Sequence, residues 1–436
     1  MRLEHIHHLP FPEPIPGLPP LFCEIDPGQI VSAVSDLIRA LLPQAANCAG
    51  LVLCGQMGGL VLTTISGVPL SNYISWRDQR LLMRPPAGAG TYFDLLFQRL
   101  SPDERRQLGN EVRPGLPLSY LFWLLQKNQM PASEAFAATL TDFVLARLCG
   151  STPAMELTQA TGALNLETLN WHYDVFSKLG LQQVRWPILR GLREPVGRLE
   201  IAGLSLPCYA PVGDHQCALA GAFIGPQELS LNISTGSQAS LLTPRLELGN
   251  YQTRPFFDNQ FLNTITHIPA GRSLNVLLGL LGELAAAQQI RLDDPWSYIQ
   301  QATSAVADTD LAVDLAFFPS PVGERGAISN ISEGNLTVGQ LFYAAFRNMA
   351  DNYQACALRL SPKRDWHTLV FSGGLAQKLE LLRTMIVARL GCDYRLCAST
   401  EDTLLGLLAL ALVVSGQAPS VAAAIETLRS REHELV

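Results

Sequence analysis

Asp214 is a candidate general base, because it follows a predicted strand and Gly213 and begins a predicted helix. In α/β folds, ligands usually bind in the crevice beyond the strand ends. A carboxylate held there can take the proton of an attacking hydroxyl, as phosphoryl transfer requires. The alternative interpretation is a helix N-cap, which is the commoner role of a lone Gly-Asp pair.

A second candidate site is the turn Ser-Thr-Gly-Ser at residues 234–237. Its backbone N–H groups and hydroxyls can hold phosphate oxygens, with Thr235 and Gly236 at the tip of a predicted β-hairpin. Serine and threonine are also ordinary turn residues, so the turn alone is weak evidence. Because the turn follows Asp214 by about twenty residues, the two together favour a catalytic interpretation over the N-cap interpretation.

Gly373 and Gly374 form a third candidate site, between a predicted strand and a predicted helix in VFSGGLAQK. Such glycines let a nucleotide approach the backbone and the N-terminus of the helix. The pattern is neither G-x-G-x-x-G nor a Walker A motif, which argues against a Rossmann dinucleotide site and a P-loop. On spacing alone, a tight strand-to-helix turn explains the two glycines equally well.

GQMGG (55–59) and SNYISWRDQR (71–80) form a fourth cluster. Trp76 could stack on the C–H face of a sugar while Asp78 and a neighbouring arginine bond its hydroxyls. The alternative is a surface turn with a local ion pair. Histidines at positions 5, 7 and 8 lack the spacing of metal ligands, and His215 is expected either to line the site at Asp214 or to be structural.

Strand, loop and helix patterns alternate along the chain and place these candidates at strand ends. The first part predicts a strand at MRLEHIHH and at 49–57, a hairpin turning at Ser66-Gly67, and four helices, at 27–41 (capped by Asp26), 118–125, 133–148 and 166–179. The second part predicts a hairpin at 228–244, helices at 214–223, 274–289, 296–307, 338–358 and 403–415, and strands before Gly373 and at CDYRLCAS. We therefore expect an α/β protein with a domain boundary near residue 222.

Composition excludes several classes of protein. The chain has 436 residues and a net charge of −7, without a basic stripe for nucleic acid. Nine scattered cysteines without a C-x-x-C pair predict reduced thiols in a cytoplasmic protein. The longest apolar run, 404–414, is too short to span a bilayer, and the first residues lack the apolar core of a secretory signal.

Six segments, taken in order, resemble motifs of the FGGY family of carbohydrate kinases. Within that family several strings look most like sedoheptulokinase, and xylulokinase is the main alternative for the substrate. The strings are GDHQC (213–217), NIST (232–235), ITHIPAGRSLNVLL (265–278), GERGAISNI (323–331) and NLTVGQLFYAAFRNMADNY (335–353). The six family segments are GQMGG (55–59), ISWRDQR (74–80), LTDFVLARLCG (140–150), PVGDHQCALAG (211–221), FSGGLAQKLELLRTMIVARLG (371–391) and TEDTLLGLLALAL (400–412).

The resemblance implies two ribonuclease H-like domains of the actin-like ATPase superfamily around a cleft, 1–222 for sugar and 223–436 for nucleotide. It implies ATP-dependent phosphorylation of a sugar hydroxyl, for instance of sedoheptulose to the 7-phosphate, with Mg²⁺. Asp214 would be the base and a metal ligand, Thr235 and Gly236 would contact phosphate, and a homodimer is left open. The resemblance assigns the sugar pocket to Gln56, Met57, Trp76, Asp78 and Gln216, and the nucleotide site to Gly373, Gly374 and Lys378.

The chain departs from the family pattern in three ways. Members begin with D-x-G-T-[ST]-x-x-K, whose residues bind Mg²⁺ and ATP phosphates, whereas MRLEHIHH aligns after that segment. We therefore expect an N-terminally incomplete first domain, either from a start codon placed too late or in a degenerate, sugar-binding pseudokinase. Gly58 stands where many members carry His, and Lys378 where many carry Asn.

Overall fold

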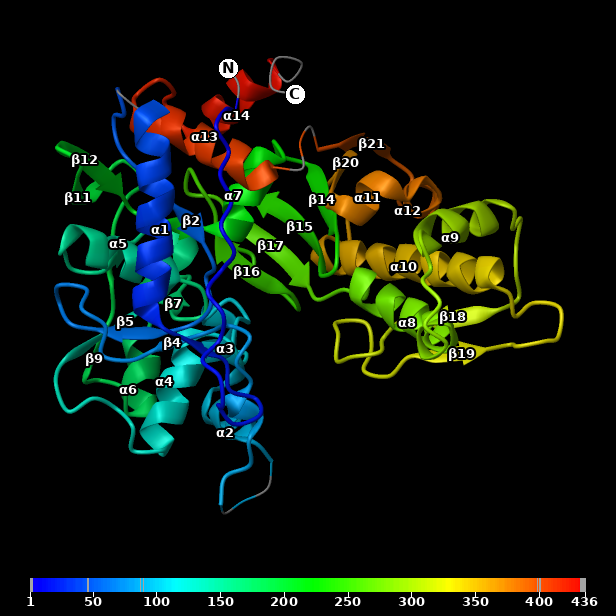
Figure 1. The fold of residues 1–436 in the computed structure, drawn as a ribbon, viewed down its shortest axis with the longest axis horizontal. Helices are drawn as coiled ribbons and strands as arrows, with labels where there is room; N and C mark the ends of the chain where they lie inside the picture. Colours follow the sequence, from blue (N-terminus) through cyan, green and yellow to red (C-terminus); the bar gives the residue numbers. More distant parts are fainter. Residues whose placement is uncertain are drawn as a thin grey trace.

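The computed structural model describes residues 3–44, 47–86, 88, 90–397, 399 and 401–431. Two α/β parts lie side by side, one formed by the first half of the chain and the other by the second half (Figure 1). The first described residues lie close to the last described helix (Figure 1), and Leu3 packs in the core that this helix shares. The mixed α/β fold predicted from the alternating patterns is confirmed.

The first part is built from short strands and from helices of moderate length. Its elements are β1 (Glu24–Ile25), α1 (Pro27–Leu41), β2 (Cys54–Gly55), β3 (Val61–Thr63), β4 (Tyr73–Ile74), α2 (Tyr92–Arg99), α3 (Pro102–Gln107), α4 (Pro117–Gln126), β5 (Ala135–Ala138), α5 (Leu140–Cys149), β6 (Ala154–Met155), β7 (Leu164–Asn165), β8 (Asn170–Trp171), α6 (Tyr173–Leu179), β9 (Val184–Arg185), β10 (Ile188–Leu189), β11 (Pro195–Ile201), β12 (Leu204–Tyr209), β13 (Val212–Gly213) and α7 (Asp214–Gly221).

The second part contains a six-stranded sheet in the order β16-β17-β15-β14-β20-β21, in which β14, β20 and β21 run parallel. Its elements are β14 (Glu228–Ile233), β15 (Ser237–Thr243), β16 (Gln252–Pro255), β17 (Phe261–Thr266), α8 (Gly271–Ala287), α9 (Pro295–Ser304), β18 (Ala312–Asp314), β19 (Ala327–Ser329), α10 (Val338–Leu360), β20 (Thr368–Ser372), α11 (Gly374–Lys378), α12 (Glu380–Leu390), β21 (Asp393–Leu396), α13 (Asp402–Val414) and α14 (Val421–Arg429).

Both faces of this sheet are buried, as the apolar strands predict. Side chains alternate across a strand, so Leu241 packs in the core shared with α10 and α12, while Leu242 packs in the core shared with α7, α13 and α14. The helices α7 and α13 cross closely. A Cβ on Gly221 would come within 1.7 Å of the Asp402 carbonyl oxygen, and one on Gly406 within 1.9 Å of the Cys217 carbonyl oxygen. Glycine at both positions therefore lets α13 hold α7 in place.

In the first part, two strand pairings set the position of α7. The three-stranded sheet β3-β5-β9 packs on α4 and α6, and β2 pairs in parallel with β13. The predicted cap of α1 is confirmed, because the Asp26 carboxylate accepts a hydrogen bond from the Gly28 N–H at 2.7 Å. The predicted hairpin turn at Ser66-Gly67 is also confirmed, by the bond from the Thr64 N–H to the Val68 carbonyl at 2.8 Å.

Several predicted elements are wrong. Residues 3–8 form no strand; four prolines between positions 10 and 16 remove backbone donors, and the segment runs extended over the surface. The predicted helix at 133–148 is the strand β5 followed by α5, and the helix predicted at 166–179 begins only at Tyr173. The last helix is α14, not α13. Periodicity failed in these places because short apolar runs fit strand and helix equally.

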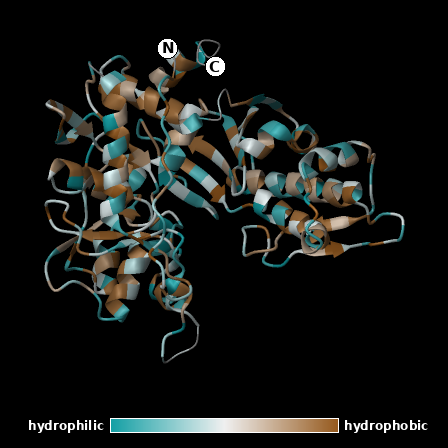
Figure 2. Ribbon diagram, in the orientation of Figure 1, coloured by the Kyte–Doolittle hydropathy of each residue, from teal (hydrophilic) through white to brown (hydrophobic). Residues whose placement is uncertain are grey.

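Most helices carry both hydrophobic and hydrophilic residues (Figure 2), as expected when one face packs on a core and the other meets solvent. In the described part of the chain, no helix has the length and apolar character needed to cross a membrane.

Candidate active site

Asp214 is the first residue of α7 and directly follows β13. Because β13 pairs in parallel with β2, Gly213 lies beside Gly55, and the next residues, Asp214 and Gln56, leave the sheet at the same edge. The pairing explains how two segments far apart in sequence meet, and it brings the candidate base next to the first sugar motif.

A cavity of about 490 Å³ opens at this edge and contains residues from both parts of the chain. Four of the predicted site residues line it: Gln56, Met57, Trp76 and Asp214. The other lining residues are Gly58, Arg113, Pro114, Gly115, Leu116, His215, Ala218, Asn232, Gln238, Arg254, Thr266, His267, Asp402 and Thr403.

The electrostatics at Asp214 suit a base. Burial raises the pKa of this carboxyl above its usual value, while a hydrogen bond from the His215 N–H at 2.7 Å and the positive charges of Arg254 and Arg113 act to lower it. A carboxylate with a raised pKa holds an abstracted proton better than an ordinary one.

Predicted residues on the sugar side are held by partners that the sequence does not reveal. The Gln56 Oε1 accepts from the Tyr73 hydroxyl at 2.9 Å, and the Thr161 hydroxyl lies 3.2 Å from the Met57 Sδ. Trp76 is 46% exposed and offers its ring to a ligand. These contacts fix the wall of the cavity before any ligand binds.

Gly58, which departs from the family pattern, lies against Gly115. A Cβ at position 58 would come within 2.7 Å of the Gly115 carbonyl oxygen and 2.8 Å of the Trp76 Cβ. The same carbonyl accepts a hydrogen bond from the Gly59 N–H at 2.8 Å. A larger residue at position 58 therefore has no room here, which explains why this chain carries glycine.

Two predicted sugar-pocket residues lie outside the cavity. Asp78 is 0% exposed and binds Arg80 through both carboxylate oxygens at 2.8 Å, while it also accepts from the Cys23 N–H at 2.6 Å. Gln216 points away from the cavity and donates to the carbonyls of Thr158 and Pro255 at 3.3 and 3.1 Å. Both side chains hold the walls of the site together instead of facing a ligand.

The predicted phosphate turn and glycine pair meet at the ends of two adjacent strands. Asn232 of β14 lies beside Ser372 of β20 in the parallel register, so the turn 234–237 and Gly373 leave the sheet together. Gly373 has a φ of +86°, and a Cβ there would come within 2.5 Å of the Ile233 carbonyl oxygen. The start of α8 joins them, because the Arg272 N–H donates to the Thr235 carbonyl at 3.0 Å.

Thr235, Gly236 and Gly374 are exposed on this edge, but none of them lines the 490 Å³ cavity. Their strand neighbours Asn232 and Gln238 do line it, so the turn sits at the rim of the cavity. Lys378 lies exposed at the end of α11, five residues beyond Gly373 along the chain.

Sequence reasoning missed Asp402 as a cavity residue. It begins α13, its carboxylate accepts from the Thr403 N–H at 2.7 Å, and burial raises its pKa above the usual value. Asp402 and Asp214 give the cavity two carboxylates, and the described residues contain no group of three or more metal-ligating side chains. Two carboxylates fit Mg²⁺ that keeps its waters and binds substrate phosphates, but not a metal held by protein alone.

A charged network at the back of the cavity was also missed. Arg254 contacts Glu111 and His215 at 2.5 and 2.7 Å, and Arg113 contacts Glu111 at 3.1 Å. These groups lie on segments more than a hundred residues apart and are buried against one another only in the folded chain. No local sequence pattern therefore predicts the network.

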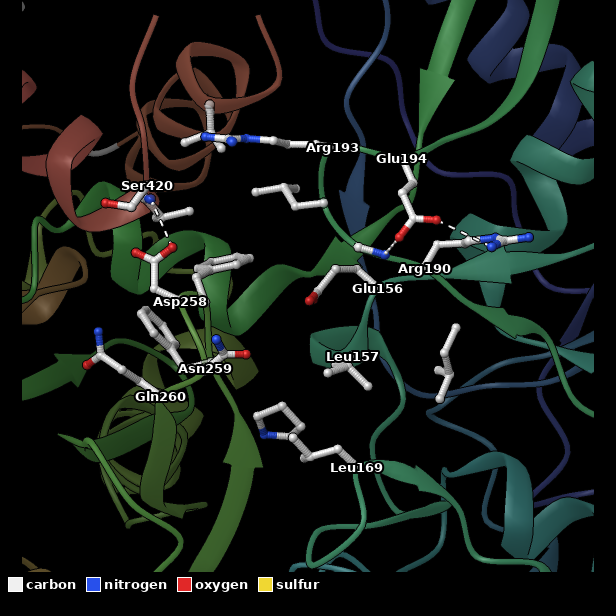
Figure 3. A pocket seen from close by; sticks show the side chains of 18 of the residues that line it. Glu156, Leu157, Leu169, Arg190, Arg193, Glu194, Asp258, Asn259, Gln260 and Ser420 are labelled. Atoms are coloured by element: carbon white, nitrogen blue, oxygen red, sulfur yellow. Dashed lines mark hydrogen bonds and ion pairs between the residues drawn. The ribbon is translucent and has the colours of Figure 1, made fainter. Parts of the chain in front are cut away.

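A second cavity, of about 580 Å³, contains none of the predicted site residues (Figure 3). Its charged groups already have partners: Asp258 accepts from the N–H groups of Val421 and Ala422, and Glu194 binds Arg190 at 3.3 Å (Figure 3). The cavity around Asp214 is therefore the better candidate for chemistry.

The sequence model described as "FGGY family of carbohydrate kinases, N-terminal domain" matches residues 4–220. The chain is 24% identical to "Glycerol kinase 2" of Saccharolobus solfataricus over 355 residues, which are 74% of this chain and 66% of that protein. It is 26% identical to a glycerol kinase of Chelativorans sp. over 395 residues, 84% of this chain and 75% of that protein.

Solved structures share the fold. A gluconate kinase from Lactobacillus acidophilus superposes with a TM-score of 0.79 at 16% identity, over 94% of this chain and 85% of that one. A glycerol kinase from Plasmodium falciparum, solved with ADP, gives 0.77 at 17% identity, and a xylulose kinase from Lactobacillus acidophilus gives 0.78 at 16%, each with the same coverage. The fold is thus the pair of actin-like ATPase domains predicted from the motifs. The match over residues 4–220 shows that this part of the chain is an N-terminal domain of the FGGY family of carbohydrate kinases.

Proposed function

We propose that this chain transfers the γ-phosphoryl group of ATP to a hydroxyl of a sugar, with Asp214 as the general base. The observation that carries the proposal is the position of Asp214. Its carboxylate lies in a cavity with Gln56, Met57 and Trp76 on one wall, and with a phosphate-type turn and a glycine pair at the opposite rim. Sugar and nucleotide would therefore meet at the carboxylate.

The reaction follows from what each side chain can do. Trp76 would stack on the sugar, and the Gln56 amide would bond a hydroxyl. Asp214 would accept the proton of the attacking hydroxyl as its oxygen bonds to the γ-phosphorus and the bond to ADP breaks. The backbone around Thr235 and Gly236 would donate to phosphate oxygens.

Mg²⁺ would neutralise charge on the ATP phosphates when bound, and Asp214 and Asp402 are the residues that would hold it. Gly373 and Gly374 would let the nucleotide lie against the backbone, with Lys378 nearby, as the family motif implies. Closure of the two parts over both substrates would complete the site.

The acceptor we propose is a ketose such as sedoheptulose, on the motifs GDHQC, NIST and ITHIPAGRSLNVLL. Xylulose is the alternative, supported by the likeness to a xylulose kinase structure. Gly58 is consistent with a pocket that differs from that of members carrying histidine at this position, since a histidine side chain would collide with Gly115.

A panel assay tests the proposal. Purified protein is incubated with Mg-ATP and, in turn, sedoheptulose, xylulose, gluconate and glycerol, and ADP release and sugar phosphate are measured. We expect acceptor-dependent ADP release, highest with a ketose. Thermal stabilisation by a sugar without ADP release would instead support the non-catalytic sugar-binding alternative. The absence of both stabilisation and ADP release would contradict both the kinase proposal and this alternative.

Three further features belong to this proposal. We place the boundary between the sugar domain and the nucleotide domain near residue 222, directly after α7, since every strand of the six-stranded sheet follows it. A cytoplasmic location is supported by free thiols such as Cys149 and Cys217. The acidic net charge supports small molecules, not nucleic acid, as partners.

A further inference from the structure

Arg254 links the two parts of the chain at the wall of the active-site cavity. It belongs to β16, yet its Nε donates to the Glu111 Oε1 at 2.5 Å and its Nη1 donates to the His215 Nδ1 at 2.7 Å. Arg254 is 3% exposed and Glu111 1%. Because two buried charges cost much desolvation energy, a buried ion pair is weak evidence of a purely stabilising role. Its place beside the candidate base suggests a functional role.

The contact with Arg254 fixes the state of His215. A guanidinium can only donate, so the Nδ1 of His215 accepts and carries no proton. The proton of the neutral ring is then on Nε2, which faces the Ser240 hydroxyl at 3.3 Å. The ring is therefore neutral and held in one tautomer.

His215 in turn holds Asp214. Its backbone N–H donates to the Asp214 Oδ1 at 2.7 Å, so the residue whose ring is fixed by Arg254 also orients the base. The positive charge of Arg254 acts on the carboxylate directly as well, because it opposes the burial that raises the pKa of Asp214. The orientation of the Asp214 carboxylate and the electrostatic field at it thus both depend on the Arg254 side chain.

We propose that Arg254, anchored by Glu111, is a positioning residue for Asp214 and acts on it through His215. The inference rests on the proposed function, in which Asp214 is the base. Since Arg254 comes from β16 and Asp214 from α7, the base is fully positioned only when these elements are packed together. Through the ion pair between Arg254 and Glu111, the correct position of the Asp214 carboxylate thus depends on the contact between the two parts of the chain.

The other charged groups at the cavity bear on any test by pH. The charge of Arg113, in the loop before α4, acts on Asp214. His267, in the loop before α8, and Asp402 of α13 line the same cavity. The pKa of His267 is lowered by burial and then by Arg113, and that of Asp402 is raised by burial. The test must therefore separate a shift at Asp214 from titration of His267.

Replacing Arg254 alone would leave Glu111 buried with one partner, and the protein could fail to fold. The double variant Arg254→Met with Glu111→Met removes both charges with side chains of similar length. Arg254→Lys keeps the charge but not the planar fork. Arg193→Met is the matched control, because Arg193 also bridges the two parts, through the carbonyls of Ala418 and Pro419 at 3.1 and 2.6 Å, but lies outside this cavity.

Kinetics measure the first consequence. In the double variant we expect kcat at neutral pH to fall by about tenfold or more, while the sugar KM changes by less than about threefold. The acid limb of the pH profile of kcat/KM should move up by about one pH unit, because a cation is lost near Asp214. The shift should persist in a His267→Gln background, be smaller in Arg254→Lys, and be absent in Arg193→Met. A kcat lowered equally at all pH values, or an equal loss in Arg193→Met, would overturn the inference.

A substrate-free measurement separates this inference from the proposed function. In ¹⁵N-histidine NMR, with the signal assigned by a His215→Gln variant, the His215 ring should be neutral at neutral pH, with its proton on Nε2. In the double variant it should titrate or change tautomer. If no acceptor gives turnover, the proposed function fails while this spectrum still decides whether Arg254 sets the state of His215. A ring that titrates in the unmodified protein, or is unchanged in the double variant, would overturn the inference.

Discussion

The sugar side and the nucleotide side of the cavity are built by different means. On the sugar side, side chains such as Gln56 and Met57 are held by distant partners, and two of the predicted ligands, Asp78 and Gln216, support the walls. On the nucleotide side, backbone geometry dominates, because the turn 234–237 and Gly373 leave adjacent parallel strands together. The sugar side therefore depends on side-chain contacts between distant segments, and the nucleotide side on backbone conformation at the ends of two paired strands.

The largest difference between the two sides should appear at Asp78. Asp78→Asn should lower the free energy of unfolding by about 3 kcal/mol, because Arg80 stays buried with fewer partners. Unfolding in urea measures the change. The matched control is Asp36→Asn, whose ion pair with Arg39 is exposed and should contribute less than about 0.5 kcal/mol. If Asp78→Asn were as stable as wild type but had lost sugar binding, Asp78 would instead be a ligand of the sugar.

On the nucleotide side, the two neighbouring glycines should behave differently. Gly373→Ala should cost about 1–3 kcal/mol and raise the KM for ATP, because residue 373 has a positive φ and a Cβ would press on the Ile233 carbonyl. A Cβ on Gly374 meets nothing within 4 Å, so Gly374→Ala should change stability by less than about 0.5 kcal/mol. Thermal unfolding and ATP titration compare them, and equal stability of the two variants would contradict this account.

Gly58→Ala should affect the sugar side through crowding. The added Cβ would approach the Gly115 carbonyl and the Trp76 Cβ, so we expect a loss of about 1–2 kcal/mol in stability and a higher KM for the sugar at unchanged KM for ATP. Unfolding curves and the two KM values measure it. A stable Gly58→Ala protein with normal sugar KM would show that this wall has room for a side chain.

The smallest effect is expected at Trp76, where the ring is half exposed. Trp76→Phe should keep stability and sugar KM within about threefold of wild type, whereas Trp76→Ala should raise the sugar KM by about tenfold with little change in kcat, as expected for a stacking contact made equally before and during reaction. Initial rates over a range of sugar concentrations test this. A large fall in kcat at constant KM would instead give Trp76 a role in the transition state.

Much of the fold could be predicted from local patterns. The helix from Pro27, the hairpin around Thr235-Gly236 and the strand-to-helix turn at Gly373 carry caps, turn residues and periodicity that act over a few residues. The segment 133–148 was misread because its alanines and phenylalanines suit a strand paired with β3 as well as a helix. Pairing partners decide such cases, and local sequence does not contain them.

As with the fold, only the part of the candidate site that depends on local patterns could be predicted from the sequence. Asp214, Gln56, Met57 and Trp76 could be found because each follows a strand or lies in a recognisable motif. Glu111, Arg254 and Asp402 could not, since their roles come from burial and from partners in other segments. The assignment of Asp78 to the sugar pocket stays a prediction, because its sequence position beside Trp76 suggests a ligand while its side chain is buried against Arg80.

The account is tested most directly by comparing wild type with Asp214→Asn at saturating sugar and Mg-ATP. Sugar-dependent ADP release should fall by about 10² to 10⁴-fold, while the sugar dissociation constant, measured calorimetrically without ATP, stays within about threefold of wild type. Asparagine keeps the shape of the side chain and can still accept from the His215 N–H, so the variant removes only the negative charge and basicity of the carboxylate. Undiminished ADP release in Asp214→Asn, or loss of sugar binding together with turnover, would contradict the central claim.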